Sequence, residues 1–338
     1  MADESFLHLS AQDRLDALGV AADRSGRPAH LLEKDVWVVW ALGVLYAAPL
    51  GEHLVFKGGT SLSKAYQVIR RFSEDVDLTY DIRAIAPDLV EENGEALPKT
   101  RSEEKRWSRE VRRRLPEWVA TVVQPVIADA LSAQALAATL RVEGERLFID
   151  YDATTTGSGY VAPSVMLEFG ARSTGEPASF RDVVCDASGL IDGLTFPVAR
   201  PRVMHAERTF WEKATAIHVF CHQDRLRGDR FARHWYDIVR LDEAGLAEAA
   251  FSDRELANAV ARHKTMFFPE KAADRRPVDY GMAVNGGLRL VPIGDGATAL
   301  EEDYGRMVED GLLFDDAERF EALMAQCADI TARANRGR

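Results

Sequence analysis

The order of apolar and polar residues predicts a chain that begins with helices, continues with strands and helices, and ends with helices alone. Residues 11–22 repeat apolar side chains at helical spacing, which indicates an amphipathic helix. Residues 30–47 are almost continuously apolar, and we expect a second, buried helix there. Strand patterns lie between residues 53 and 198, and helical patterns follow residue 202. This order predicts an α/β (α+β) amino-terminal part followed by a helical part.

A pair of glycines follows the first predicted strand. The apolar residues 53–56 lead into Gly58 and Gly59, and a helix is expected to begin at Thr60 or Ser61, either of which can serve as its N-cap. Paired glycines let the backbone approach a ligand closely, and a helix N-terminus offers free amides to a phosphate. The segment has neither the spacing of a P-loop nor a GxGxxG fingerprint, which excludes both of those nucleotide-binding motifs.

Two aspartates alternate along the next predicted strand. Side chains of a strand point alternately to opposite faces, so Asp75 and Asp77 share a face with Ser73, while Val76 and Leu78 point into a core. Two neighbouring carboxylates repel each other unless a cation lies between them. A divalent metal is the natural partner, and such sites are typical of phosphoryl and nucleotidyl transfer. A solvated acidic turn is the plainer interpretation of the same residues.

The middle of the chain is predicted to contain a loop, a long helix and a pair of strands. We expect the loop over residues 83–100, the helix over 101–138, and strands over 140–152 and 161–171 that form a hairpin around 157–159. The first turns of the helix are rich in Arg and Lys but interrupted by glutamates. This mixture favours a solvated helix face over a contact with an RNA backbone.

The last third of the chain is predicted to be mainly helical. A short strand is expected near residues 194–198, and residues 267–295 are rich in Pro, Gly and charge, which indicates a loop. The expected helices cover residues 206–221, 230–244, 253–263, 298–310 and 316–334.

Composition limits the class of protein. The chain has 338 residues, of which 46% are hydrophobic and 28% are charged, as in a globular protein of one large or two modest domains. No run of 18 apolar residues is present, so no membrane span is predicted. The three cysteines lie far apart and the N-terminus is polar and acidic, so we expect a cytoplasmic protein without structural zinc. A net charge of −12 argues against a broadly basic surface that coats nucleic acid.

Four segments together resemble a known family. Residues 58–64 (GGTSLSK) and 72–78 (FSEDVDL) are similar to the first two motifs of the AbiEii/AbiGii-type nucleotidyltransferase toxins, a group that includes the mycobacterial MenT toxins. Residues 207–213 (ERTFWEK) and 233–238 (RHWYDI) resemble the third and fourth motifs, in the same order. The group is a branch of the DNA polymerase beta-like nucleotidyltransferase superfamily. The resemblance implies a mixed sheet flanked by helices within residues 1–200, with a mainly helical domain over residues 201–338.

The resemblance also implies roles for individual residues. The implied catalytic residues are Asp75, Asp77, Lys213 and Asp237. The implied binding site for a nucleoside triphosphate consists of Gly58, Gly59, Thr60, Ser61, Lys64, Ser73 and Lys213. Asp75 and Asp77 are the implied ligands of Mg²⁺, in a site that can hold two ions, and relatives often add a third carboxylate from a neighbouring strand.

Glu168 is the best candidate for that third carboxylate. Strand alternation places it opposite two large apolar residues, which is compatible with a single acid that faces a cleft. Asp150 and Asp152 on the preceding strand compete for the role. An ion pair between Glu168 and Arg172 would explain the glutamate without any ligand.

The two later residues also have structural explanations. Lys213 fits a surface lysine with a solvated head, which we would favour without the resemblance. Asp237 fits an ordinary helical i,i+4 pair with Arg233. His218 and His222 have helical i,i+4 spacing but lack the glutamate of HExxH, which favours packing over metal binding.

The resemblance implies a toxin that transfers a nucleotide to an RNA acceptor. The favoured acceptor is the 3′ end of tRNA, the expected result is a block of translation, and the expected partner is a cognate antitoxin, as in phage-defence systems. One alternative is a nucleotidyltransferase that modifies a small molecule or a protein side chain, which the acidic net charge mildly favours. Another alternative is a GTP-binding toxin that acts by sequestration.

Overall fold

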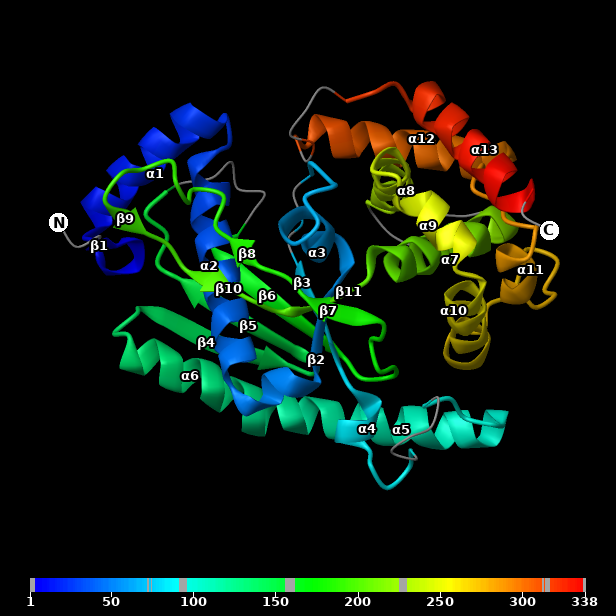
Figure 1. Cartoon of the computed structure of the whole chain (residues 1–338), viewed down its shortest axis with the longest axis horizontal. Helices are drawn as coiled ribbons and strands as arrows, with labels where there is room; N and C mark the ends of the chain where they lie inside the picture. The colour runs from blue at the N-terminus through cyan, green and yellow to red at the C-terminus, as the bar shows by residue number, and fades with distance from the viewer. Residues whose placement is uncertain are drawn as a thin grey trace. The chain divides into compact units, whose positions relative to one another are not determined.

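The computed structural model has a mixed α/β fold that divides into two compact units (Figure 1). It describes residues 4–71, 73, 75–90, 96–155, 162–224, 230–311, 313 and 317–336. Unit 1 contains Met1–Ala65, Ser73–Ala96 and Trp107–Val203. Unit 2 contains Tyr66–Phe72, Leu97–Arg106 and Met204–Arg338. Two short segments from the first 200 residues therefore group with the helical unit.

A mixed seven-stranded sheet, counted over the described residues, is the framework of unit 1. Its strand order is β4-β5-β6-β3-β2-β11-β7. Strand β3 pairs in parallel with β6 and antiparallel with β2, and β5 pairs antiparallel with both β4 and β6. The strands are β2 (Leu54–Lys57), β3 (Asp75–Tyr80), β4 (Ala138–Glu143), β5 (Arg146–Tyr151), β6 (Ser164–Gly170), β7 (Ala178–Phe180) and β11 (Arg202–Met204).

One face of this sheet is buried and the other is half-exposed. Along β3 the buried positions include Val76 and Leu78, and β5 and β6 alternate in the same way. Two tryptophans cover the buried face, because Trp37 stacks on Tyr151 and Trp118 packs against β3 and β6. Since side chains alternate along a strand, the polar residues between these apolar ones lie on the open face.

The helices of unit 1 follow the apolar pattern closely. Helix α1 (Ala11–Ser25) is capped by the Ser10 side chain and ends at Gly26 with φ +72°. Helix α2 (Ala29–Ala47) is buried along most of its length, as its sequence predicts. The expected long helix consists of α5 (Arg101–Trp118), a π-helical turn (Val119–Val123) and α6 (Gln124–Ala133). The remaining helical segments are α3 (Gly58–Lys64), α4 (Ile82–Ile85) and two 3₁₀ turns, η1 (Phe6–His8) and η2 (Pro49–His53).

Two local predictions are wrong. Helix α3 begins at Gly58 rather than at Thr60 or Ser61. The hydroxyls of Thr60 and Ser61 donate to the backbone carbonyls of Asp75 and Gly58, so neither of them caps the N-terminus of the helix. The single strand expected over residues 140–152 is the hairpin β4–β5, which turns at Gly144 with φ +61°. A glycine at positive φ between two short strands allows that turn. The hairpin turn expected at residues 157–159 lies outside the described residues.

Short strands that the sequence pattern indicated only in part form two small additional sheets. Strand β1 (Glu4–Ser5) pairs with β9 (Leu194–Thr195), and β8 (Val183–Val184) pairs with β10 (Val198–Ala199). A short strand was expected near residues 194–198, whereas β1 and β8 were not expected. Two-residue strands carry too little periodicity to be read from a sequence.

Unit 2 is built around helix α7 (Ala206–Gln223), which packs against α8, α9, α10 and α11. Trp211 and Trp235 are fully buried, and their indole N–H groups donate to the carbonyls of Ala250 (2.9 Å) and Leu290 (2.6 Å). These two tryptophans therefore hold helices together. The other helices are α8 (Arg233–Glu243), α9 (Leu246–Ser252), α10 (Arg254–Phe267), α11 (Tyr280–Val284), α12 (Gly294–Glu309) and α13 (Phe320–Arg336). Within the described part of the chain, no helix is long and apolar enough to cross a bilayer.

Candidate active site

The predicted aspartates lie on the open face of the sheet in unit 1. Asp75 and Asp77 are half-exposed, whereas Val76 between them is buried. The register places Asp77 between Lys57 on β2 and Glu168 on β6. Lys57, Asp77 and Glu168 thus form one row of charged residues across three neighbouring strands. The face predicted from alternation is the face that the structure shows.

Gly58 brings the chain backbone directly beside Asp77. Its φ is +76°, and a Cβ built on it would lie 2.1 Å from Asp77 Oδ2. Both the backbone conformation and the lack of a side chain are therefore required there. Thr60 and Ser61 are buried, and their hydroxyls bond to backbone carbonyls within the same turn. The glycine turn and the Asp-x-Asp strand thus form one local unit.

Glu168 is the only candidate third carboxylate on the strand next to Asp77, among the residues that the structure describes. Its carboxylate accepts a hydrogen bond from Arg146 Nε at 3.0 Å, so its ion-pair partner is Arg146 rather than the expected Arg172. Asp150 lies on β5, which is separated from β3 by β6, and it bonds to Ser164. Asp152 is exposed beyond the end of β5.

The two aspartates fit a hard divalent cation. Carboxylate oxygens are the ligands that Mg²⁺ prefers, and a pair on one open strand face leaves room for water and phosphate oxygens. No cluster of three or more His, Cys, Asp or Glu with metal-binding geometry occurs among the described residues. Asp75 and Asp77 are therefore the residues that would hold the ion, and Glu168, held by Arg146, would join them only after releasing that arginine.

Lys64 is held in a buried ionic cluster of unit 1. Its Nζ lies 2.6 Å from Asp35 Oδ1 and 2.6 Å from Asp186 Oδ1, and Arg27 pairs with Asp186. Burial raises the pKa of Asp35, and the charges of Lys64 and Arg27 offset part of that rise. Lys64 was expected to approach a phosphate, whereas here its charge is matched by protein carboxylates. Three consecutive charged residues, 33–35, inside an otherwise apolar helix were the available signal for this cluster.

Lys213 and Asp237 meet in a buried ionic cluster of unit 2. Lys213 Nζ lies 2.8 Å from Asp237 Oδ2, and Arg71 makes two further bonds to the same carboxylate, at 2.7 and 2.8 Å. Asp237 is completely buried and Lys213 is 8% exposed. Lys213 is therefore no surface lysine, and the contacts of Asp237 are made with residues distant in sequence. Arg71 was missed by the sequence analysis.

The charges of this second cluster keep Asp237 ionised. Burial alone would raise the pKa of Asp237, but Arg71 and Lys213 outweigh it and hold that pKa well below its ordinary value. Burial lowers the pKa of Lys213, and Asp237 counteracts part of this effect. Lys213 therefore shares its single carboxylate partner with the guanidinium of Arg71.

Two further predictions can be placed. Ser73 is half-buried and precedes the first residue of β3, so strand alternation does not fix its direction, and its neighbour Glu74 lies outside the described residues. The rings of His218 and His222 lie 4.4 Å apart, and Nδ1 of His218 accepts the backbone N–H of Arg289. Burial lowers the pKa of His218 to about 3, so this ring is a neutral packing residue.

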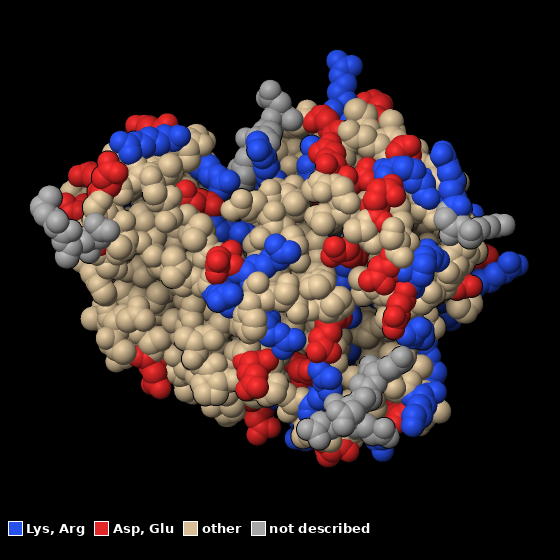
Figure 2. All heavy atoms as spheres, viewed as in Figure 1, with Lys and Arg blue, Asp and Glu red and all other residues tan. Residues whose placement is uncertain are grey.

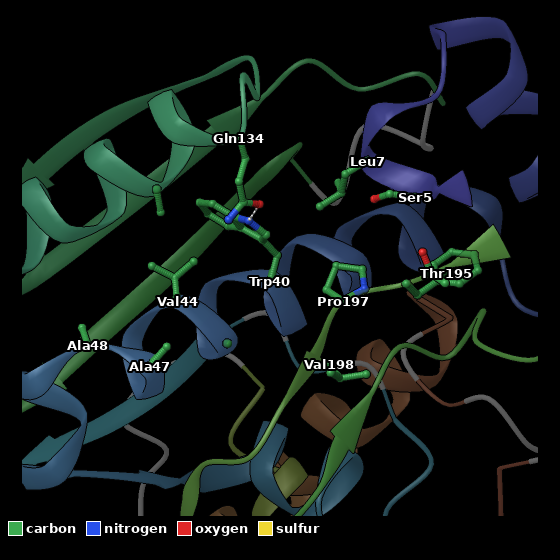
Figure 3. Close-up of a pocket in the computed structure, with 13 residues that line it drawn as sticks. Ser5, Leu7, Trp40, Val44, Ala47, Ala48, Gln134, Thr195, Pro197 and Val198 are labelled. Atoms are coloured by element: carbon green, nitrogen blue, oxygen red, sulfur yellow. Dashed lines mark hydrogen bonds between the residues drawn. The ribbon is translucent and has the colours of Figure 1, made fainter. Parts of the chain in front are cut away.

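A separate cavity of about 580 Å³ lies in unit 1 between α2, α6 and the segment that joins β9 to β10 (Figure 3). Trp40 donates to Gln134 at 2.9 Å across its wall. None of the predicted site residues lines this cavity.

Figure 2 shows one face of the molecule, on which acidic and basic side chains are interspersed. This face is therefore not broadly basic.

Comparison with known proteins identifies the family. A model of the family described as "Nucleotidyl transferase AbiEii toxin, Type IV TA system" matches residues 40–326, which include all four motif segments. Among solved structures, the chain is similar to MenT4, the nucleotidyltransferase toxin Rv2826c from Mycobacterium tuberculosis H37Rv, with 15% sequence identity, a TM-score of 0.40, and coverage of 95% of this chain and 97% of that one. A comparison with curated proteins gives no match. Because the family match spans most of its length, the chain belongs to the AbiEii nucleotidyltransferase toxin family.

Proposed function

We propose that this nucleotidyltransferase toxin transfers a nucleotide from a nucleoside triphosphate to an RNA hydroxyl, with the 3′ end of tRNA as its acceptor, and thereby blocks translation. The observation that carries the proposal is the pairing of an open-face Asp-x-Asp strand with a glycine whose backbone lies beside Asp77. The missing side chain at position 58 makes room for the Asp77 carboxylate, which keeps the aspartate pair beside the start of α3. An RNA acceptor places the activity in the cytoplasm.

In the proposed reaction the acceptor oxygen bonds to the α-phosphorus, the bond to pyrophosphate breaks, and the hydroxyl proton is lost. Asp75 and Asp77 would hold Mg²⁺, which when bound neutralises phosphate charge and can steady the attacking and leaving oxygens. Gly58 and Gly59 would let the triphosphate approach the backbone, and Ser73 would bond a phosphate oxygen. Thr60, Ser61 and Lys64 would hold the glycine turn in place through their bonds to protein groups. Lys213 would offset charge that develops on the leaving group, and Asp237 would hold its ammonium in place.

Membership of a type IV toxin–antitoxin family implies an antitoxin partner. We propose that this partner limits access to the aspartate pair or to the acceptor RNA. Expression of this chain without the antitoxin should therefore arrest growth, and expression of variants without transferase activity should not.

A transfer assay tests the proposal directly. Purified protein is incubated with Mg²⁺, purified tRNA and each of the four α-labelled nucleoside triphosphates in turn. We expect label in tRNA, and we expect Asp75→Ala, Asp77→Ala and Lys213→Ala each to lower it about 100-fold or more, because each removes a charge from the reacting centre. The matched control is Glu143→Gln, an exposed carboxylate on the edge strand β4, which should keep full activity.

The same assay separates the alternatives. Label in a small product or in protein, with tRNA unlabelled, would favour the other acceptors. Growth arrest that survives in folded Asp75→Ala and Lys213→Ala proteins would favour nucleotide sequestration and end the catalytic proposal.

The glycine turn provides a second test. Gly58→Ala and Gly26→Ala both place alanine at positive φ, and each should lose about 1–2 kcal/mol of unfolding free energy. Only at Gly58 does the new methyl group meet Asp77 Oδ2, whereas the space around Gly26 is open. We therefore expect transfer to fail in Gly58→Ala and to persist in Gly26→Ala. Equal activity of the two folded variants would contradict the proposed site.

A further inference from the structure

A second cavity, of about 200 Å³, lies in unit 2 beside the C-terminal half of α7. Val219, Phe220 and Tyr280 are buried and supply apolar lining. Phe231 and Phe268 are only half-buried and supply two more aromatic rings. Pockets for whole drug-sized ligands measure about 300–1,000 Å³, so this one suits a single ring system.

The polar side chains that line this cavity include two acceptors, Gln223 and Glu270, and one cation, Lys264. Gln223 is 7% exposed, and its side-chain nitrogen donates to Glu270 Oε2 (3.2 Å) and to the carbonyl of Lys271 (2.9 Å). These two bonds fix the amide so that its oxygen is left as an acceptor, and the Glu270 carboxylate adds more. Lys264 Nζ lies 5.1 Å from the centre of the Phe268 ring.

This combination selects one class of ligand. Aromatic faces favour a flat ring, and the acceptors favour a ring that carries N–H donors. Lys264 and Glu270 line the same cavity with opposite charges, so together they favour neither a cationic nor an anionic guest. An amino-bearing nucleobase is a flat ring with several N–H donors, whereas an aromatic protein side chain brings at most one donor.

We propose that the cavity binds one amino-bearing nucleobase of the acceptor RNA, an inference that rests on the proposed function. Helix α7 carries both Lys213 and Gln223, which lie about 15 Å apart along the helix axis at 1.5 Å per residue. The base held here is therefore an internal base of the acceptor, away from the hydroxyl that reacts. Stacking of single-stranded bases on aromatic side chains is a general mode of RNA recognition.

Binding of short RNAs tests the proposal without any transfer step. The probes are labelled 12-nucleotide oligomers of A, C and U and a matched abasic ribose-phosphate oligomer, measured by fluorescence anisotropy at fixed salt. We expect the A or C oligomer to bind more tightly than the U and abasic oligomers. Phe268→Leu keeps an apolar residue but removes the ring, and it should weaken that oligomer about 5- to 150-fold while leaving the abasic oligomer unchanged.

Two further variants guard against a trivial loss of folding. Phe180→Leu changes an exposed phenylalanine of unit 1 and should bind like the parent. Glu143→Gln changes an exposed carboxylate on the edge strand β4 of unit 1 and should also bind like the parent. Thermal unfolding of each variant is recorded alongside.

The outcomes separate this inference from the proposed function. Unchanged affinity of Phe268→Leu, or an equal loss for the abasic oligomer, overturns the inference even if tRNA is still labelled in the transfer assay. If Phe268→Leu loses a protein that co-purifies with the parent and keeps its affinity for RNA, the cavity belongs to a protein partner, and the inference is also overturned. Absence of both RNA binding and RNA labelling in the parent protein would end the proposed function and this inference together.

Discussion

The two buried ionic clusters, one in each unit, hold their lysine in different ways. In unit 1 a single buried lysine, Lys64, lies between two carboxylates, and the partly exposed Arg27 completes the cluster. In unit 2 a single carboxylate, Asp237, lies between two buried cations. Lys64 therefore has two carboxylate partners, whereas Lys213 shares one with Arg71.

This difference bears on which lysine can interact with a ligand. A buried lysine between two carboxylates has its charge matched within the fold. A lysine that shares one carboxylate with an arginine has its charge matched less fully, and an anionic ligand such as a triphosphate is attracted to it. On this comparison Lys64 serves mainly to fix α3 against α2 and the β8–β9 connection, and Lys213 is the better candidate for a triphosphate contact.

The largest expected effect comes from Asp237→Asn. The substitution removes the buried carboxylate that Lys213 and Arg71 share, so the unfolding free energy should fall by about 3–5 kcal/mol, as measured by denaturant titration. Glu243→Gln on the same helix is the matched control, and since Glu243 is exposed it should change stability by about 0.5 kcal/mol or less. A loss below about 1 kcal/mol for Asp237→Asn would show that the cluster is not the charged anchor described here.

A smaller effect is expected for Asp35→Asn. Lys64 keeps Asp186 as a counter-ion, and asparagine keeps an oxygen that accepts the Asp186 amide. The loss should be about 1.5–3 kcal/mol, the contribution of a hydrogen bond to a charged group. A loss as large as that of Asp237→Asn in the same titration would remove the distinction between the two clusters.

The smallest effect is a difference in pH dependence. The folded pKa of Asp35 is raised by burial, so its contribution to stability is greatest below its usual value of 3.8 and declines as pH rises through the folded pKa. The folded pKa of Asp237 is lowered, so its contribution is complete above 3.8 and is lost only as pH falls further. The stability difference between the parent and Asp35→Asn should thus shrink as pH rises above about 3.8, by at most about 1.4 kcal/mol per pH unit, until Asp35 is fully ionised.

The corresponding difference for Asp237→Asn should stay level over the same range. Denaturant titrations at intervals of about half a pH unit would check both courses. Parallel courses for the two variants would mean that the environments of the two carboxylates do not differ as described.

Local periodicity predicted the features that depend on neighbours in sequence. The faces of β3 followed from strand alternation, and the positions of α1 and α2 followed from apolar spacing. The glycine pair was expected to let the backbone approach a ligand, and in the structure Gly58 lies against the Asp77 side chain. The missed turn at Gly144 lies between two strands with the same alternation, so the apolar pattern passes through it without a break.

The charge partners depended on the tertiary fold and were not predictable in this way. Arg71 and Asp237 are 166 residues apart, and Lys64 and Asp186 are 122 residues apart. A lysine a few residues after a glycine turn looks the same in sequence whether it binds a phosphate or a distant aspartate. The sequence therefore indicated which residues belong to the site but not which of them are already engaged by protein groups.

The two hydrogen bonds from the Arg71 guanidinium to the Asp237 carboxylate have a consequence for activity at high pH. A guanidinium keeps its proton at any pH that the fold survives, so Arg71 is a permanent cation. The pKa of Lys213 is lowered by burial, so its ammonium is the cation of this cluster that titrates first as pH rises. Once Lys213 has lost its proton, it no longer offers a positive charge to a triphosphate, whereas Arg71 still pairs with Asp237. Nucleotide affinity should therefore decline at high pH while the folded protein stays intact.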